Sequence, residues 1–345
     1  MNGSLPAPPI RRAVVIGDGS WGTAIAQLLA GRGIATTLWS PFLEQSQAMQ
    51  RTRTNEKFLP GVKLHEDLAF SADPLSAIED IELAVSVVPT QYLRAVAERF
   101  EFALPGHVTV CSATKGLEIE TLQRPTAILG EVLGEREMVV LSGPSHAEEV
   151  ARGLPASVVA ASRDPALATL VQESLTSESF RVYTSDDPVG AELGGALKNV
   201  IAIAAGISDG LELGDNAKAA LLTRGMAEMA RLGEQMGAKR ETFFGLAGIG
   251  DLVTTCCSRH SRNRSVGEAI GRGETLEQVL DRMEMVAEGV WTTKALFGPE
   301  AMFAGGELPI ASQVHAVLFE GKDPREAVLD LMRRAPAAEI QDPGR

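Results

Sequence analysis

Lys198 stands in the stretch "GGALKNVIAIAAG" (194–206), where a charged side chain is unexpected. The residues one helical turn away are glycines and aliphatic residues, so no acid is spaced to pair with the ammonium along a helix. In one interpretation the aliphatic stem lies along apolar side chains and the ammonium reaches solvent. In the other, the lysine is held in a cleft with a lowered pKa and exchanges a proton with a bound substrate.

Three other stretches place polar groups where packing does not require them. The segment "CSATKGLE" puts Lys115 at the carboxyl end of a predicted strand, where doubly wound sheets bind ligands. The segment "VLSGPSHAEEV" puts Gly143 and Ser145 in a similar strand-to-helix turn with available backbone N–H groups. In "GLAGIGDL", Asp251 follows a glycine-rich turn, and its carboxylate is a candidate partner for Lys198.

The segment "SRNR" (261–264) carries two arginines in a chain whose formal net charge is −13. It is open to two interpretations, a solvated basic loop or an anchor for an anion. Because the overall charge repels anions, an anionic substrate needs a local basic pocket. Lysine and arginine side chains directed at one cleft suit a phosphorylated substrate.

The glycine motif near the start of the chain predicts a dinucleotide site. An apolar run leads into G-x-G-x-x-G at Gly17, Gly19 and Gly22, and an amphipathic helical pattern follows. The first glycine permits the turn, the second admits the pyrophosphate, and the third allows close packing of helix and strand. After the next predicted strand, Ser40 and Pro41 replace the usual acid or arginine, so NAD and NADP both remain open.

These residues are expected on a doubly wound, mainly parallel α/β sheet of the Rossmann type, followed by an all-helical part. The predicted strands are continuous apolar runs, as is typical of strands buried on both faces: 12–17, 35–39, 82–89, 108–114, 138–143, 156–162 and 180–184. Helical patterns occur between most of them, at 21–32, 91–101, 124–134 and 165–176.

After residue 184 the helical period persists, at 188–211, 216–237, 265–271, 275–284, 290–304, 311–320 and 324–333. An aspartate cap and a proline in "SDDPVG" mark the first of these helices. We therefore expect a disordered tail at 1–10, a dinucleotide-binding domain at 11–186, a helical substrate and catalytic domain at 187–333, and a second tail at 334–345.

Composition narrows the possible functions. The acidic balance disfavours nucleic acid or an anionic membrane as a partner. Three cysteines and five scattered histidines form no disulfide framework and no metal-ligand pattern. We expect no membrane-spanning run, no membrane insertion and no signal peptide, hence a cytoplasmic protein.

Taken together and in order, these motifs resemble the bacterial-type NAD(P)-dependent glycerol-3-phosphate dehydrogenases over roughly residues 11–333. The matching segments are "GDGSWGTA", "ATKGLE", "SGPS", "GGALKNVIAIAAGISDG", "TRGMAEM", "GLAGIGDL", "SRNR" and "VAEGVWTTK". The segment Trp39-Ser40-Pro41 departs from the family, since it lacks a basic residue often found there.

The resemblance implies reversible hydride transfer between dihydroxyacetone phosphate and sn-glycerol 3-phosphate, a precursor for glycerophospholipid synthesis. It implies that Lys198 donates and accepts the proton at the C2 oxygen, that Lys115 adds charge there, and that Asp251 orients Lys198 while Thr255 lines the site. It further implies substrate contacts from Gly143, Ser145, Ser261, Arg262 and Asn263. The cofactor contacts it implies are Ser20, Trp21, Lys115, Ala147, Arg262, Val286 and Glu288.

Two alternatives remain at this point. A related 3-hydroxyacid or 6-phosphogluconate-type dehydrogenase would account for the glycine motif and the lysine, though not for "SRNR" or "GLAGIGDL". A non-catalytic dinucleotide sensor would be expected to have lost Lys198 or Asp251, and both are present. A homodimer is expected only by analogy with similar folds.

Overall fold

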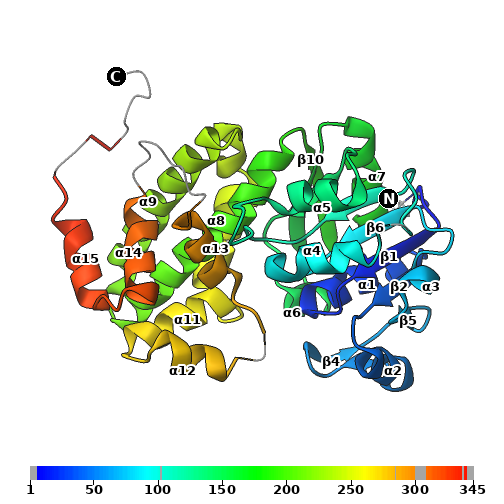
Figure 1. Ribbon diagram of the computed structural model, residues 1–345, viewed down its shortest axis with the longest axis horizontal. Helices are drawn as coiled ribbons and strands as arrows, with labels where there is room; N and C mark the ends of the chain where they lie inside the picture. The colour runs from blue at the N-terminus through cyan, green and yellow to red at the C-terminus, as the bar shows by residue number, and fades with distance from the viewer. Residues whose placement is uncertain (1–5, 102, 284, 300–307, 336–337, 340–345) are drawn as a thin grey trace.

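The computed structural model describes residues 6–101, 103–283, 285–299, 308–335 and 338–339. A half built around a β-sheet lies beside a half built from helices, and α8 (Pro188–Gly210) begins the helical half (Figure 1). The sheet half comes first in the chain, as the sequence pattern predicts.

The main sheet has eight strands in the order β10-β9-β8-β7-β6-β1-β2-β5. Its strands pair in parallel, except that β8 and β9 are antiparallel. The strands are β1 (Arg12–Ile16), β2 (Ala35–Trp39), β5 (Ala69–Ser71), β6 (Leu83–Ser86), β7 (Thr109–Ser112), β8 (Val139–Ser142), β9 (Ala156–Ala161) and β10 (Phe180–Ser185). The predicted mainly parallel sheet is therefore confirmed.

Helices cover both faces of this sheet, which explains the continuous apolar runs. In β1, Val15 packs into one buried cluster, while Val14 and Ile16 pack into another on the opposite face. The helices of this half are α1 (Ser20–Gly31), α2 (Leu43–Thr52), α3 (Pro74–Ala77), α4 (Thr90–Glu98), α5 (Pro125–Leu133), α6 (Ala147–Val150) and α7 (Pro165–Leu175).

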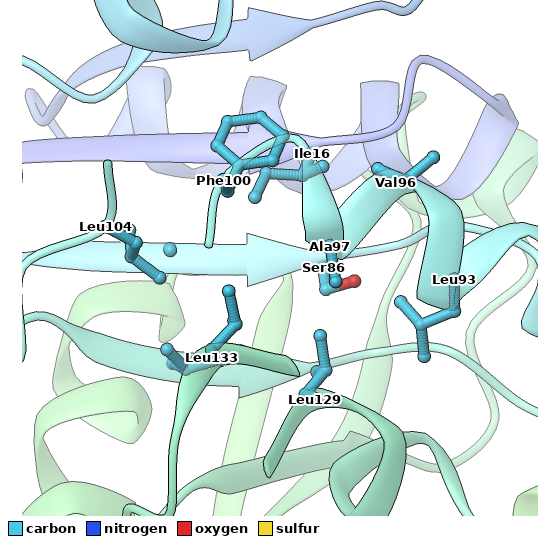
Figure 2. A pocket seen from close by; sticks show the side chains of 11 residues that line it. Ile16, Ser86, Leu93, Val96, Ala97, Phe100, Leu104, Leu129 and Leu133 are labelled. Carbon is cyan, nitrogen blue, oxygen red and sulfur yellow. The ribbon is translucent and has the colours of Figure 1, made fainter. Parts of the chain in front are cut away.

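A small cavity of about 20 Å³ lies on the face covered by α4 and α5 (Figure 2). Its lining is aliphatic and aromatic apart from Ser86. A space of this size and polarity offers nothing to hold a charged substrate, so it is a packing defect of the core.

Several short elements were missed by the sequence pattern. In the sheet half they are α2, α3, α6, β5 and a two-stranded hairpin of β3 (Thr54–Asn55) and β4 (Leu59–Lys63), and in the helical half α10 (Asp251–Cys257) was missed as well. None carries a continuous apolar run; the burial of β4, for example, is limited to two of its five residues. Tertiary contacts rather than local periodicity define such elements.

The helical half contains α8, α9 (Gly214–Gln235), α10 (Asp251–Cys257), α11 (Arg262–Gly271), α12 (Leu276–Asp281), α13 (Glu288–Leu296), α14 (Pro309–Phe319) and α15 (Pro324–Met332). The predicted cap of α8 is confirmed, since Asp187 Oδ1 accepts from Gly190 N at 3.0 Å and Pro188 is the first helical residue. The helix predicted over 290–304 instead ends at Leu296, and residues 300–304 lie outside the described residues.

Two expectations need correction. The window within α8 is long and apolar enough to cross a membrane by composition, contrary to the expectation of no such run; 94% of it is buried inside the fold, as the central core helix. Ile10, expected in a disordered tail, is 3% exposed and packs into the core beside β1. Residues 1–5 of that tail lie outside the described residues.

Candidate active site

Lys198 is buried, and its ammonium pairs with Asp251. The distance from Lys198 Nζ to Asp251 Oδ1 is 2.6 Å, and Nζ also donates to Thr255 Oγ1 at 2.6 Å. The Lys198 side chain is 7% exposed and that of Asp251 is 2% exposed. The interpretation of a lysine that reaches solvent is therefore wrong, and the predicted Lys198–Asp251 pair is confirmed.

The other oxygen of the same carboxylate binds the lysine of the sheet half. Lys115 Nζ lies 2.7 Å from Asp251 Oδ2 and donates to the Gly143 carbonyl at 3.1 Å. Ser145 Oγ donates to that carbonyl as well, at 2.9 Å. One carboxylate thus holds two ammonium groups that come from the two halves of the molecule.

Burial and charge set the protonation of this cluster. Burial lowers the pKa of Lys198 to about 8, with the Lys115 charge acting in the same direction and Asp251 opposing both. Burial alone would raise the pKa of Asp251, but the two lysines outweigh it and the pKa falls below its usual value. The carboxylate is therefore ionised near neutral pH, while Lys198 is close to its midpoint.

Close backbone packing brings α8 to this carboxylate. The glycine-rich turn before Asp251 is a turn of π-helix, Leu246–Gly250, that runs directly into α10. A Cβ at Gly194 of α8 would lie 2.3 Å from the Ala247 carbonyl oxygen. Only glycine permits this approach, which sets Lys198 one turn further along α8 against Asp251.

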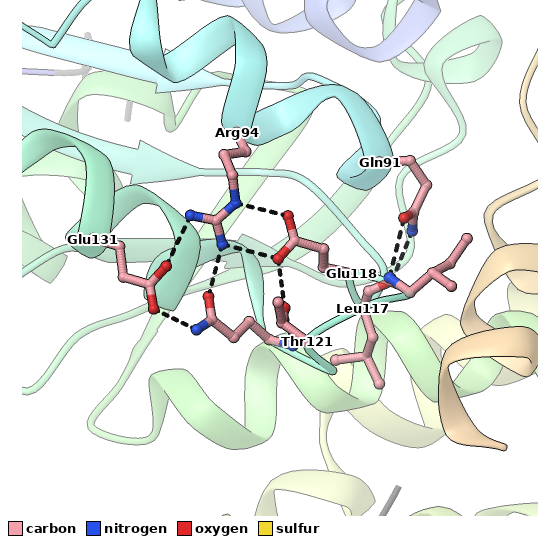
Figure 3. Close-up of polar contacts among 8 residues, drawn as sticks. Gln91, Arg94, Leu117, Glu118, Thr121 and Glu131 are labelled. Atoms are coloured by element: carbon pink, nitrogen blue, oxygen red, sulfur yellow. Dashed lines mark hydrogen bonds and ion pairs between the residues drawn. The ribbon is translucent and has the colours of Figure 1, made fainter. Parts of the chain in front are cut away.

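The loop that follows Lys115 is fastened to α4 (Figure 3). Gln91 Nε2 donates to the Leu117 carbonyl at 2.8 Å, and the Arg94 guanidinium binds both oxygens of Glu118 at 3.0 and 2.9 Å. The bond to Arg94 is the main cause that lowers the pKa of Glu118. A two-point ion pair of this kind fixes the course of the chain that presents Lys115.

The "SRNR" segment forms the first turn of α11 rather than a solvated loop. Ser261 is its N-cap and accepts from Arg264 N at 3.2 Å. Arg262 is exposed and donates to the Val286 carbonyl at 2.8 Å, while Asn263 is buried and accepts from Gly289 N at 2.9 Å. The expected substrate and cofactor residues of this region therefore lie together.

Arg264 is occupied elsewhere. Its Nε lies 2.6 Å from Asp209 Oδ2, and its Nη1 lies 3.3 Å from Glu268. Arg264, the second arginine of the segment, thus fastens α11 to α8. Arg262 makes no ion pair with Asp209 or Glu268.

Glu288 connects this region to the sheet half. Its Oε1 accepts from Thr90 N at 3.0 Å, while its Oε2 is buried without a hydrogen-bond partner. Burial raises the pKa of Glu288 to about 7. A Cβ at Gly116 would lie 2.7 Å from Oε2, so Glu288 is also next to the loop of Lys115.

Two residues near the site were missed by the sequence reasoning. Thr90 contributes through its backbone amide, for which no side-chain pattern gives a signal. His146 follows Ser145, and its ring centroid lies 6.0 Å from that of His260, which precedes the "SRNR" segment. Burial lowers the pKa of His146. A histidine inside "SGPSH" was the available signal for this contact between the halves.

The glycine loop fits a dinucleotide pyrophosphate. Gly17 has φ of 114°, and a Cβ at Gly22 would lie 1.9 Å from the Gly17 carbonyl oxygen. Gly19 is the N-cap of α1 without a side-chain cap, and a Cβ there would meet nothing within 4 Å. Open space before uncapped N–H groups suits an anion. Next to it, Trp21 Nε1 is buried without a hydrogen-bond partner.

Ser20 and Ala147 are the first residues of α1 and α6, both buried where these helices begin. Within the described part of the chain, no group of three or more His, Cys, Asp or Glu side chains is placed to hold a metal.

A sheet with a glycine loop at its carboxyl edge, joined to a helical half that provides a buried lysine, defines a class: the two-part, dinucleotide-dependent dehydrogenases. Residues 12–168 match the family model described as NAD-dependent glycerol-3-phosphate dehydrogenase N-terminus, and residues 187–329 match the corresponding C-terminus. The chain belongs to this family of oxidoreductases.

Relatives agree with that assignment along nearly the whole chain. The NAD(P)+ glycerol-3-phosphate dehydrogenase of Geobacter sp. (strain M21) is 50% identical over 331 residues, 95% of this chain and 98% of the relative. The enzyme of the same name from Geobacillus thermodenitrificans is 48% identical over 95% of this chain and 96% of the relative. The crystal structure of the Coxiella burnetii glycerol-3-phosphate dehydrogenase has a TM-score of 0.90 at 38% identity, covering 95% of this chain and all of that one.

The two alternatives lose their support. Both halves match the glycerol-3-phosphate dehydrogenase family, which assigns the chain there rather than to a 3-hydroxyacid or 6-phosphogluconate type. A non-catalytic sensor would be expected to lack Lys198 or Asp251, but both residues are present and paired.

Proposed function

We propose that this chain catalyses the reversible reduction of dihydroxyacetone phosphate to sn-glycerol 3-phosphate with NADH or NADPH. Family membership supports the reaction, and one observation supports the site: a single buried carboxylate, Asp251, that holds Lys198 and Lys115 from opposite halves. The product would serve glycerophospholipid synthesis.

A dinucleotide held at the glycine loop of Gly17, Gly19 and Gly22 would supply the hydride for the ketone carbon and would accept it in the reverse direction. As the ketone is reduced, negative charge develops on its C2 oxygen, and the Lys198 ammonium stabilises this charge and donates a proton. In the reverse direction neutral Lys198 accepts the hydroxyl proton. Asp251 and Thr255 hold Nζ in place, and Lys115 adds positive charge beside it.

Gly143, Ser145, Ser261, Arg262 and Asn263 would hold the substrate, with the Arg262 guanidinium paired to the phosphate. On the cofactor side, Gly17, Gly19 and Gly22 would admit the pyrophosphate. Ser20, Trp21, Lys115, Ala147, Arg262, Val286 and Glu288 would contact the rest of the dinucleotide.

The test is an oxidation assay of NADH and NADPH with dihydroxyacetone phosphate, followed by identification of the product. We expect turnover with the phosphate ester and very little with unphosphorylated dihydroxyacetone. Equal rates with the two ketones would contradict the phosphate site, and no turnover with either dinucleotide would contradict the function.

We also propose a cytoplasmic enzyme, a homodimer, and a domain division between residues 186 and 187. The three cysteines, Cys111, Cys256 and Cys257, are free thiols, which suits a reducing compartment. The assembly and the division are checked by light scattering and by limited proteolysis.

A further inference from the structure

Asp18 lies between the first two glycines of the dinucleotide loop and reaches the end of the neighbouring strand. Its Oδ2 accepts from Ser40 Oγ at 2.8 Å, and Ser40 is the first residue after β2. Both residues are buried. Dinucleotide-binding sheets commonly carry an acid at the end of this second strand, where it binds the hydroxyls of the adenosine ribose. In this chain the carboxylate near the end of the second strand belongs to Asp18, which lies in the loop after β1.

The surrounding bonds fix Asp18 in position. Its backbone carbonyl accepts from Asn55 Nδ2 at 2.7 Å and from Thr23 Oγ1 at 3.2 Å, and Asn55 also donates to Thr23 Oγ1 at 2.8 Å. The Ser40 hydroxyl donates its proton to the Asp18 carboxylate. The Ser40 hydroxyl is therefore not free to donate to an added phosphate, and the Asp18 carboxylate can only accept hydrogen bonds.

No lysine or arginine occurs among residues 40–50, directly after β2. Pro41 and Phe42 follow Ser40, and the acid Glu44 lies in the first turn of α2. Arg53 is engaged, since its guanidinium donates to the carbonyls of Leu68, at 2.8 Å, and Glu66. This leaves negative charge and apolar surface at the ribose end of the loop.

Lys57 is the nearby cation to be considered. It is exposed, and its ammonium lies 4.9 Å from the centroid of the Phe58 ring and 5.9 Å from that of Phe42. The two rings hold the ammonium at the exposed surface, where its attraction for a phosphate is screened. Its charge still acts on the Asp18 carboxylate, where it partly opposes the rise in pKa that burial causes.

We propose that Asp18, held by Ser40, is the residue that selects NAD(H) over NADP(H) in this chain. Its carboxylate accepts from the ribose hydroxyls of NAD(H) and repels the additional phosphate of NADP(H). The proposal rests on the proposed function only in requiring a dinucleotide at the glycine loop.

The test measures the dissociation constants of NADH and NADPH without substrate, by titration calorimetry. We expect the parent chain to bind NADH at least about tenfold more tightly than NADPH. Asp18→Asn keeps the shape and an acceptor for Ser40 but removes the charge, and it should reduce that ratio by about tenfold. Asp73→Asn is the matched control: it removes the same charge from an exposed helix cap and should leave the ratio unchanged.

The proposal is overturned if the parent protein binds NADPH as tightly as NADH or more tightly. It is also overturned if Asp18→Asn has the melting temperature of the parent and the same ratio of NADH to NADPH affinity. A selective loss of NADPH affinity in Lys57→Met would assign the phosphate to Lys57 and also overturn it. If the binding ratio holds while dihydroxyacetone phosphate is not reduced, the proposed function fails and the role of Asp18 stands.

Discussion

A lysine that exchanges a proton needs a pKa near the working pH, so that its charged and neutral forms are both populated. Burial gives Lys198 such a pKa. Withdrawal from water destabilises the ammonium, while Asp251 prevents the pKa from falling further. While Lys198 is protonated, the two ammonium groups outnumber the single carboxylate and the cluster carries a net positive charge, which is lost when Lys198 becomes neutral. In a chain of net charge −13, this cluster and Arg262 provide the local positive charge that a phosphorylated substrate needs.

Replacing Lys198 with methionine keeps the length of the side chain but removes the ammonium group that would donate the proton. We expect kcat to fall about 10²–10⁴-fold, with dinucleotide affinity unchanged. Stability should fall by about 1–3 kcal/mol, because buried Asp251 loses one of its two ammonium partners. Steady-state kinetics and denaturant unfolding measure the two effects.

The matched control is Lys218→Met, which removes another lysine–aspartate pair, with Asp209 at 2.7 Å, from the helical half. This protein should retain its kcat. A Lys198→Met protein with more than a few per cent of the parental kcat would contradict the assignment of the lysine as proton donor.

The pKa of Lys198, lowered to about 8, predicts opposite pH profiles for the two directions. Ketone reduction needs the ammonium, so its kcat should fall as the pH rises through about 8. Alcohol oxidation needs the neutral amine, so its kcat should rise through the same range. Profiles at saturating substrate measure this, and parallel profiles in both directions would contradict the proton role.

At the scale of elements, glycines place the site by allowing backbones to approach. Gly22 sets α1 against the start of the glycine loop, and Gly194 sets α8 against the π-helical turn before Asp251. Both contacts leave less than a normal van der Waals distance for a Cβ. Gly19 differs, because the space over it is open to solvent or ligand.

Gly19→Val tests that difference. The backbone angles at this position, φ −62° and ψ 175°, are accessible to valine, and no neighbour opposes its Cβ, so the fold should be retained. Dinucleotide binding should be lost, because the side chain fills the space before the helix N-terminus. A variant with parental affinity in a titration would contradict the position of the pyrophosphate.

The elements that the sequence predicted were those with long apolar periods. The main buried strands follow from such patterns, and so do the helices of the C-terminal half except α10. The lysine–aspartate pair follows from a charge in need of a partner. The pairing of Lys115 with the same carboxylate depends on the packing of two halves, and no local pattern encodes it. The π turn was missed for the same reason, since "GLAGIG" is equally compatible with a loop.

At the scale of the whole molecule, the two halves are joined by buried charges as well as by packing. Glu192 of α8 lies against the first turn of α5 in the sheet half, where it accepts from Thr126 N and Thr126 Oγ1, both at 2.7 Å, and pairs with Arg124. Its side chain is 1% exposed. Because Lys115 and Lys198 reach Asp251 from opposite halves, bonds of this kind hold the site together at a distance from it.

Glu192→Ala should therefore destabilise the protein by about 3–5 kcal/mol, because it leaves the Arg124 guanidinium without a carboxylate and the Thr126 amide without an acceptor where α8 meets α5. Glu192→Gln keeps acceptors for Thr126 and should cost less. Asp186→Asn breaks the exposed ion pair with Lys239, also between neighbouring segments of the two halves, and should leave the unfolding midpoint nearly unchanged. Denaturant unfolding ranks the three variants. If Glu192→Ala unfolds at the same denaturant concentration as Asp186→Asn, the buried Glu192 carboxylate does not help to join the halves and has no part in holding the two lysines on Asp251.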